Sequence, residues 1–394
     1  MPYNFDELIT RRGTGCVKWD EQSADDIIPM WVADMDFRCA RPIINALRRR
    51  VEHGVYGYTH VPEQYYQAVI DWFRRRHGWT IQREWMLYTT GVVPALSVIV
   101  KALCEPGDKV IVQTPAYNCF FSSVKNNGCL VEENPLVYEN HTYHIDFDAL
   151  ERSCSDPRAK LLLFCNPHNP GGRVWTREEM LSLNDICMRH GVRVLADEIH
   201  NELVMPGYEY LPFASLSDET LANSISCNAP SKSFNTAGMY ISNIECSDAA
   251  IRQKLDRVIN INEVCDVNLF GVEAVMAAYN ESEDWIDQLC PYIWDNYQAL
   301  CAFFKEEMPS IGITKLEGTY LVWADISALG ITSEALCQRL LDEGRVWMNP
   351  GTMYDPREGK HFIRINIAAP RSRVMEGLRR MAKVVKQITA DGNE

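Results

Sequence analysis

The chain has 394 residues, of which 46% are hydrophobic and 23% are charged, and this length is enough for two globular domains. A net charge of -14 and a pI near 5.2 argue against a nucleic-acid partner and disfavour a membrane-surface role, because both need basic surface. The start, MPYNFDELITRRGTG, has acidic residues and no apolar core, and no later stretch is apolar for long enough to span a bilayer. We therefore expect a cytoplasmic protein.

The fourteen cysteines form no CxxC pair, and many have apolar neighbours. This pattern favours buried, reduced thiols over disulfides or a metal site, so no metal is expected. The cysteines on which this expectation rests are Cys104, Cys119, Cys129, Cys165, Cys187, Cys227 and Cys301.

Two features stand out in the first hundred residues. The amphipathic segment PIINALRRRVEHG, residues 42–54, predicts a helix, which we expect to pack near the C-terminal part of the chain. Further on, Gly91-Val92-Val93-Pro94 follows the apolar run WMLYTT and predicts a glycine turn that opens a helix. The free N–H groups of such a turn suit a phosphate, although many ordinary strand-to-helix turns look alike.

Four apolar runs in the middle of the chain predict strands that are covered on both faces. They are KVIVQTP (109–115), AKLLLFCNP (159–167), VRVLADE (192–198) and SISCNAP (224–230). Between them, residues 176–191 predict a helix with Thr176 as N-cap, Glu179 completing a capping box and Gly191 as its C-terminal stop. Such strands belong to a largely parallel sheet between helices, so we predict a doubly wound α/β domain.

The C-terminal part has a different pattern. Residues 285–308 predict a long helix that Pro291 could bend, and TYLVWADIS (319–327) and HFIRINIAA (361–369) predict two strands. A last helix should carry one apolar side, made of Val374, Leu378, Met381, Val385 and Ile388. These elements indicate a smaller α+β domain.

Polar residues follow each central strand, at the edge where open α/β sheets bind ligands. Tyr117 could lie over an aromatic ligand or fill the core. NPHNPGG makes a rigid turn that could aim the amide of Asn169, or it could be a plain tight turn. Asp197 needs a positive partner if it is buried, either a protonated ring nitrogen or a salt bridge. Lys232, in PSKSFNTAGM, could be an ordinary loop lysine or a Schiff-base lysine.

Together these residue types meet the needs of pyridoxal 5'-phosphate (PLP): a phosphate cradle, a stacking ring, an amide, an acid and a lysine. The chain resembles the fold-type I PLP enzymes and, within them, the MalY/PatB-type carbon–sulfur β-lyases. The resemblance runs from Phe5 to the last helix. It rests on VKWDE, PMWVADMDF, HGVYGYT, NPHNPGGRVW, DEIH, SKSFNTAG, FIRIN and APRS.

The resemblance implies the fold-type I PLP-dependent transferase fold, of class α/β, with a mostly parallel seven-stranded sheet in a large domain and a smaller α+β domain. We expect residues 46–285 to form the large PLP-binding domain and residues 286–394 to form the small one. Residues 1–45 should join the small domain.

By the same resemblance, Lys232 forms the Schiff base with PLP and then removes the substrate's Cα proton. Asp197 keeps the ring nitrogen protonated, Asn169 donates to the phenolic oxygen O3′, and Tyr117 stacks on the ring. His200 stands where many aminotransferases carry a tyrosine that bonds O3′, so imidazole would have to make that bond. The peptide bond between Asn169 and Pro170 is a candidate cis bond.

The phosphate site implied by the resemblance lacks two contacts that are usual in aminotransferases. Ala229 stands where serine or threonine is common, and Tyr240 stands where many relatives carry a basic residue. Backbone amides and hydroxyls must then meet the phosphate charge, and Tyr58 is expected from a second subunit, so that the active site belongs to a homodimer. The expected phosphate ligands within the chain are Gly91, Val92, Val93, Ser231 and Ser233.

Arg364, in FIRIN, matches the arginine that holds the substrate's α-carboxylate, with a structural ion pair as the alternative. Tyr117 and Asn169 should also contact the substrate. The segment WVADMDF should fold over the site, with Ala33 near the substrate and Trp31 or Asp34 in support. Tyr320 and Tyr354 could line the pocket for the substrate's side chain.

The activity that the resemblance implies is α,β-elimination from L-cystathionine, L-cysteine or another S-substituted cysteine, giving a thiol, pyruvate and ammonia. An aminotransferase acting on aromatic amino acids or histidinol phosphate is the alternative enzyme. A PLP-binding regulator without turnover is a further alternative. It is disfavoured because such regulators usually carry an N-terminal DNA-binding domain, and the family pattern here begins at residue 5.

Overall fold

The computed structural model describes residues 2–261 and 265–391, and its centre is a seven-stranded sheet of order β2-β10-β9-β8-β7-β3-β4. Strand β10 runs antiparallel to both of its neighbours, and the other pairs are parallel. The predicted mostly parallel sheet is thereby confirmed. Its strands are β2 Met86–Thr89, β3 Lys109–Thr114, β4 Leu130–Pro135, β7 Ala159–Cys165, β8 Arg193–Asp197, β9 Ser224–Asn228 and β10 Ser242–Glu245.

Side chains of the central strands alternate between two buried layers, as period-two strands between helices must. In β3, Val110 and Val112 pack under α4, α5 and α9, whereas Ile111 packs on the opposite face with α6 and α7. The predicted capping box of Thr176 and Glu179 is present at the start of α7. These helices, with α8 beside α7, are α4 Val92–Leu103, α5 Asn118–Lys125, α6 Phe147–Cys154, α7 Arg177–Arg189, α8 Asp218–Asn223 and α9 Ala249–Asn260.

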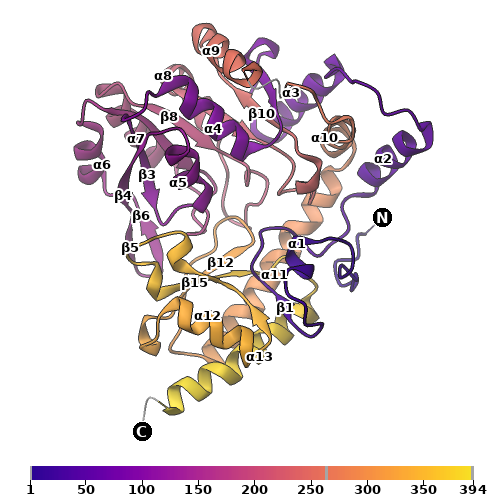
Figure 1. Ribbon diagram of the computed structural model, residues 1–394, viewed down its shortest axis with the longest axis vertical. Helices are drawn as coiled ribbons and strands as arrows, with labels where there is room; N and C mark the ends of the chain where they lie inside the picture. The colour runs from indigo at the N-terminus through magenta and orange to yellow at the C-terminus, as the bar shows by residue number, and fades with distance from the viewer. Residues whose placement is uncertain (1, 262–264, 392–394) are drawn as a thin grey trace.

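A second, four-stranded sheet of order β11-β12-β15-β14 forms the C-terminal part, and Figure 1 shows it below the larger sheet, with α12 and α13. Helix α11 (Glu283–Glu307) leads into it and continues past Pro291. All five side chains predicted for the apolar side of the last helix are buried. The elements are β11 Gly312–Ile313, β12 Leu321–Asp325, α12 Ser333–Asp342, β14 Asn349–Pro350, β15 Phe362–Asn366 and α13 Arg371–Asp391. The domain limits near residues 45 and 285 stay a prediction.

The N-terminal segment divides its contacts between the two parts. After α1 (Val17–Asp20), β1 (Ile28–Pro29) pairs in parallel with β13 (Val346–Trp347) of the C-terminal part. Helix α2 (Arg41–His53) instead packs on α10 (Leu269–Glu281), as does α3 (Glu63–His77) (Figure 1). The expectation that α2 packs near the C-terminal part is therefore wrong. The reason is that α10 is buried on nearly all sides and needs covering helices.

The remaining two strands, β5 (Val137–Glu139) and β6 (Thr142–His144), form a short hairpin.

Within residues 2–261 and 265–391, no helix is long and apolar enough to cross a membrane, and no group of three His, Cys, Asp or Glu side chains could hold a metal ion. All fourteen cysteines are free thiols. Of the seven singled out from the sequence, Cys119 and Cys301 are half-buried and the other five are buried.

Candidate active site

Three predicted site residues lie at or just after the carboxyl ends of three adjacent parallel strands. Asn169 follows β7, Asp197 ends β8, and Lys232 follows β9, and near these ends Cys165, Asp197 and Cys227 lie side by side in register. Because parallel strands end at the same edge of a sheet, the three polar side chains converge there. They line one pocket of about 340 Å³.

This pocket also brings together most of the other predicted residues. It is lined by Ala33, Gly91, Val92, Val93, Tyr117, Asn169, Asp197, His200, Ser231 and Lys232. Ser233 was expected at the phosphate as well, but it is fully buried and does not line the pocket, because the fold packs it into the interior beside the loop. Tyr58 lies outside the pocket of its own chain and is 98% exposed.

Asp197 is buried with little to stabilise its charge. Its Oδ1 accepts one hydrogen bond, from the backbone N–H of Ile199 at 3.2 Å. Burial raises the pKa of Asp197 to about 7, although the nearby Lys232 acts in the opposite direction. A cationic partner in the pocket would stabilise the carboxylate and return its pKa towards the ordinary value.

The turn that carries Asn169 is rigid, as its sequence predicted. The peptide bonds that precede Pro167 and Pro170 are cis, which confirms the predicted cis bond after Asn169. The loop closes through hydrogen bonds from Gly172 N–H to the His168 carbonyl at 2.8 Å and from His168 N–H to the Arg173 carbonyl at 2.7 Å.

Ion pairs fix the far end of this turn. Arg173 is paired with Glu179 at the start of α7 (2.9 Å) and with the buried Glu317 (2.8 Å). Glu317 also accepts the backbone N–H of Val174 at 3.0 Å. The turn is therefore tied both to the helix that follows it and to the C-terminal part of the chain.

Arg364, on β15, is buried and has no Asp or Glu partner among the described residues. Its Nη1 donates to Oδ1 of Asn169 (3.2 Å), its Nη2 donates to the carbonyl of Trp31 (2.9 Å), and its Nε has no partner. The guanidinium lies over the ring of Tyr354 at 4.5 Å. A structural ion pair is thus not what holds Arg364, and its charge is available to an incoming carboxylate.

The contact with Arg364 also orients Asn169. Because Oδ1 accepts from the guanidinium, the amide N–H groups are left without a partner in the part of the chain that the structure describes. The amide is thus able to donate into the pocket that Asn169 lines.

Lys232 has one hydrogen-bond acceptor. Its Nζ donates to the carbonyl of Ala33 at 2.7 Å, and the hydroxyl of Tyr320 donates to the same oxygen at 2.9 Å. Burial and the charge of Arg364 lower the pKa of Lys232 to about 8, against the opposing effects of Asp34 and Asp197. At this pKa roughly a tenth of the amine is neutral at pH 7 and about half at pH 8, and the neutral form is the one that a nucleophilic lysine uses.

The two tyrosines expected around the substrate's side chain do not line the cavity. Tyr320 is fully buried behind Ala33, and Tyr354 lies under Arg364, where its hydroxyl accepts a hydrogen bond from Asn349 at 2.9 Å. Both support groups of the pocket from behind.

His200 is neutral and incompletely bonded. Its burial, with the charges of Lys232 and Arg364 nearby, lowers the pKa of the imidazole well below its usual range, and its Nδ1 has no hydrogen-bond partner within residues 2–261 and 265–391. Tyr117, at the start of α5, keeps its phenol proton because burial raises its pKa. Both rings are thus neutral, and the imidazole of His200 has a ring nitrogen left for a ligand.

The glycine turn lies at the N-terminus of α4. Gly91 has φ +142°, a conformation that other residues adopt with strain, and it is followed by the twelve residues of α4. Gly91, Val92 and Val93 line the pocket. Their free N–H groups and the helix dipole suit an anion there.

The model of the family "Aminotransferase class I and II" matches residues 32–380. Cystathionine beta-lyase PatB of Bacillus subtilis strain 168 is 43% identical over 96% of this chain and 98% of its own length. The chain belongs to the class I and II aminotransferase family. Protein MalY of Escherichia coli K12 is 30% identical over 98% of this chain and all of its own length. The crystal structure of cystalysin from Treponema denticola, which contains a pyridoxal 5'-phosphate cofactor, has a TM-score of 0.95 at 35% identity and covers 98% of this chain and 100% of its own.

These relatives place the chain with the MalY/PatB-type members of the class I and II aminotransferase family, and its fold is fold-type I. Some residues of this family member's pocket carried no signal in the sequence. Ile199 lines the pocket between the predicted Asp197 and His200, and Ala237 and Ile241 line it beside Tyr240. Apolar lining residues look like any core residue until the fold brings them to a cavity.

Proposed function

We propose that the chain is a PLP-dependent carbon–sulfur β-lyase that cleaves L-cystathionine, L-cysteine or another S-substituted cysteine to a thiol, pyruvate and ammonia. The observation that carries the cofactor and amino-acid part is one pocket that unites Lys232, Asp197 and Asn169 beside a buried Arg364, for which the described part of the chain supplies no carboxylate partner. The choice of lyase rests on the likeness to PatB and MalY.

The groups around the pocket fit PLP. Among the described residues, Asp197 forms no ion pair and the buried Nδ1 of His200 has no hydrogen-bond partner, so both have capacity for a polar ligand. We assign the ring nitrogen to Asp197, O3′ to Asn169 and His200, the ring face to Tyr117, the phosphate to Gly91, Val92, Val93 and Ser231, and the aldehyde to Lys232.

The bound cofactor would supply an electron sink next to the substrate's Cα. Arg364 would bind the α-carboxylate with its planar fork, and its bond to Asn169 would fix the fork's orientation. Lys232, as a neutral amine, would then take the proton from Cα.

The protonated Lys232 would next give this proton to the departing sulfur. The Cβ–S bond breaks, both of its electrons go to sulfur, and the proton makes the free thiol. The remaining three-carbon enamine is released, and water hydrolyses it to pyruvate and ammonia. Lys232 is then neutral again and ready for the next turnover.

We infer that the enzyme is a homodimer in which Tyr58 of one subunit reaches the phosphate site of the other. The connection between α2 and α3 runs at the edge of the molecule (Figure 1). Tyr58 belongs to this connection, and Val55 and Tyr56 beside it in the chain are also exposed. A run of exposed apolar and aromatic side chains is typical of an interface. The cytoplasmic location stays a prediction, which cell fractionation would check.

The lyase proposal is tested by supplying L-cystathionine without any 2-oxo acid. We expect one pyruvate for each thiol released, because elimination needs no amino-group acceptor. Lys232→Ala should lose both this activity and the visible absorbance of bound PLP. A strict requirement for a 2-oxo acid would instead identify an aminotransferase, and substantial elimination by Lys232→Ala would overturn the role given to the lysine.

A further inference from the structure

The segment of residues 31–36, which we call the strap, crosses the pocket and is held by side chains rather than by a sheet. The carbonyls of residues 31 to 35 all accept hydrogen bonds from side chains elsewhere in the chain. One of these is the bond from Lys232 to Ala33. The direction of each strap carbonyl is therefore set by specific side chains.

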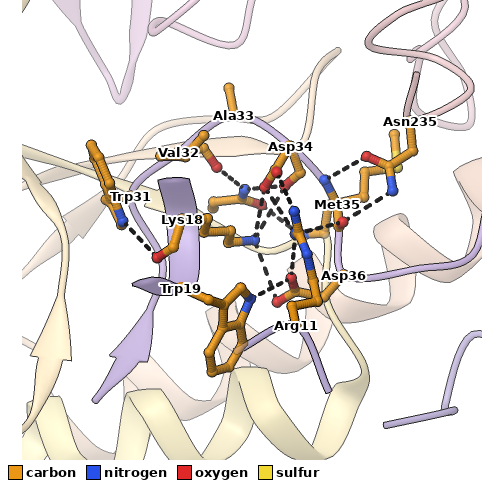
Figure 2. Close-up of polar contacts among 12 residues, drawn as sticks. Arg11, Lys18, Trp19, Trp31, Val32, Ala33, Asp34, Met35, Asp36 and Asn235 are labelled. Carbon is orange, nitrogen blue, oxygen red and sulfur yellow. Dashed lines mark hydrogen bonds and ion pairs between the residues drawn. The ribbon is translucent and has the colours of Figure 1, made fainter. Parts of the chain in front are cut away.

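Asn235 ties the strap to the loop that carries the lysine. Its Oδ1 accepts the N–H of Met35 at 3.0 Å, and its Nδ2 donates to the carbonyls of Met35 (3.0 Å) and Phe37 (2.8 Å). Figure 2 shows this amide meeting both backbone groups of Met35. Asn235 stands three residues after Lys232, so two anchors join the same loop to the strap.

Asn366 holds the strap from the side of β15. Its Nδ2 donates to the carbonyls of Val32 and Asp34, the two neighbours of Ala33 in the chain. Asn366 stands two residues after Arg364 on β15, so both point to the same face of the strand. The Ala33 carbonyl is thus bracketed by two fixed neighbours.

A buried charge cluster fixes the end of the strap. The carboxylate of Asp36 is fully buried and is met by Arg11 (2.8 Å), Lys18 (3.4 Å) and the indole N–H of Trp19 (2.9 Å). Figure 2 shows Arg11 and Lys18 reaching Asp34 as well. Because separating a buried pair is strongly unfavourable, this end of the strap has little freedom to move.

We propose that Asn235 is a positioning residue, which docks the strap on the lysine loop so that the Ala33 carbonyl is the acceptor for Lys232 whenever its amine is free. A neutral amine that donates one N–H to a fixed carbonyl keeps its lone pair in a defined direction, and the same carbonyl stabilises the ammonium form. The role of Lys232 in turnover rests on the proposed function, whereas the docking rests on the contacts alone.

The test removes the amide of Asn235 without adding charge or strain. Asn235 has φ +55°, which glycine adopts freely, so Asn235→Gly keeps the backbone conformation. The charged and titratable groups that interact with Lys232 are Arg364, Asp34, Asp197, Cys119 and His200, and the variant leaves all five in place.

The main readout is the rate at which the full-length chain, freed of cofactor, takes up PLP as a function of pH. This rate follows the neutral fraction of Lys232. Losing the carbonyl acceptor destabilises the ammonium form, so in Asn235→Gly the pH midpoint should fall by about one unit. In the loaded enzyme, kcat should fall about tenfold while KM changes by less than about threefold.

Two further variants separate positioning from general loosening. Asn140→Gly makes the same change at an exposed turn residue with φ +52°, and it should alter neither readout. Asn366→Ala acts on the strap from another element, and it should shift the PLP-uptake midpoint in the same direction as Asn235→Gly.

An unchanged midpoint in Asn235→Gly would overturn the proposal. A shift in Asn235→Gly without one in Asn366→Ala would also overturn it, because only the lysine loop would then have been disturbed. Failure of the lyase proposal is recognised separately, by the absence of acceptor-free pyruvate from the unaltered enzyme.

Discussion

At the scale of single residues, burial acts in opposite directions on the two central ionisable groups. It raises the pKa of Asp197 to about 7 and lowers that of Lys232 to about 8, because in both cases the charged form loses hydration. The carboxyl is thereby prepared for a cationic partner, and the amine for nucleophilic attack. The same pocket thus destabilises both charged forms until a bound ligand supplies the polar contacts that water would otherwise make.

Asp197→Asn should stabilise the cofactor-free chain at alkaline pH. A carboxyl whose pKa is raised on folding favours the fold while protonated, and this advantage is lost as the pH rises from about 4 to about 7. The amide of asparagine does not titrate, so its contribution to the free energy of unfolding stays constant over that pH range. The difference in free energy of unfolding, variant minus unaltered chain, should therefore be about 3 kcal/mol larger at pH 8 than at pH 5.

Urea unfolding at the two pH values measures this difference, and PLP affinity serves as the second readout. We expect Asp197→Asn to bind PLP more weakly even though its cofactor-free form is more stable. A stability difference that does not change with pH would contradict burial as the cause of the Asp197 pKa.

At the scale of elements, α10 fits closely against the segment that closes the pocket. A Cβ on Gly271 would lie 2.8 Å from the carbonyl of Met239 and 3.1 Å from Cβ of Ile241. The Met239 carbonyl also accepts a hydrogen bond from Asn268 at 2.8 Å. Since Tyr240 and Ile241 line the pocket, the helix and the site share this contact.

Gly271→Ala should therefore disturb both the fold and the site. Overpacking should lower the free energy of unfolding by about 1–3 kcal/mol, which exceeds the gain of up to about 1 kcal/mol from replacing glycine in a helix. PLP should also dissociate faster, because residues 239–241 must move. Gly238→Ala is the matched control, since its Cβ would meet nothing within 4 Å. Equal behaviour of the two variants would show that the close contact is unimportant.

Elements whose signals are local were predictable from the sequence. The capping box of Thr176 and Glu179 and the four central strands are examples, because caps and apolar runs involve neighbouring residues. The packing of α2 on α10 was not predictable, since it depends on surface more than 200 residues away. Asn235 belongs to a quoted motif, yet its partners Met35 and Phe37 lie about 200 residues earlier, so only the fold shows its contacts.

At the scale of the whole molecule, the proposed dimer makes each pocket depend on two chains. Tyr58 lies outside its own pocket, and a twofold axis would carry it to the other subunit and bring that subunit's Tyr58 back in return. A substitution of Tyr58 in one subunit should therefore impair the pocket of the other subunit, whereas a substitution of Lys232 should impair the pocket of its own subunit.

Co-expression of Tyr58→Ala with Lys232→Ala checks this arrangement. A mixed dimer would contain one pocket with both residues intact and one pocket with neither, and half of randomly paired dimers are mixed. Elimination activity should thus recover to about a quarter of the unaltered level, above that of either variant alone. Activity equal to the mean of the two separate variants would mean that each chain completes its own pocket.

The pairing of Ile28 with Val346 has a consequence for biosynthesis. The ribosome makes the strap among the first forty residues, but its partners β13 and β15 are among the last fifty. A nascent chain that has already formed the large sheet, with Asp197 and Lys232 in place, therefore lacks Arg364 and the anchors that Arg364 and Asn366 of β15 give to the strap. We expect cofactor capture to be a post-translational event, which requires the complete chain rather than the part that contains the lysine.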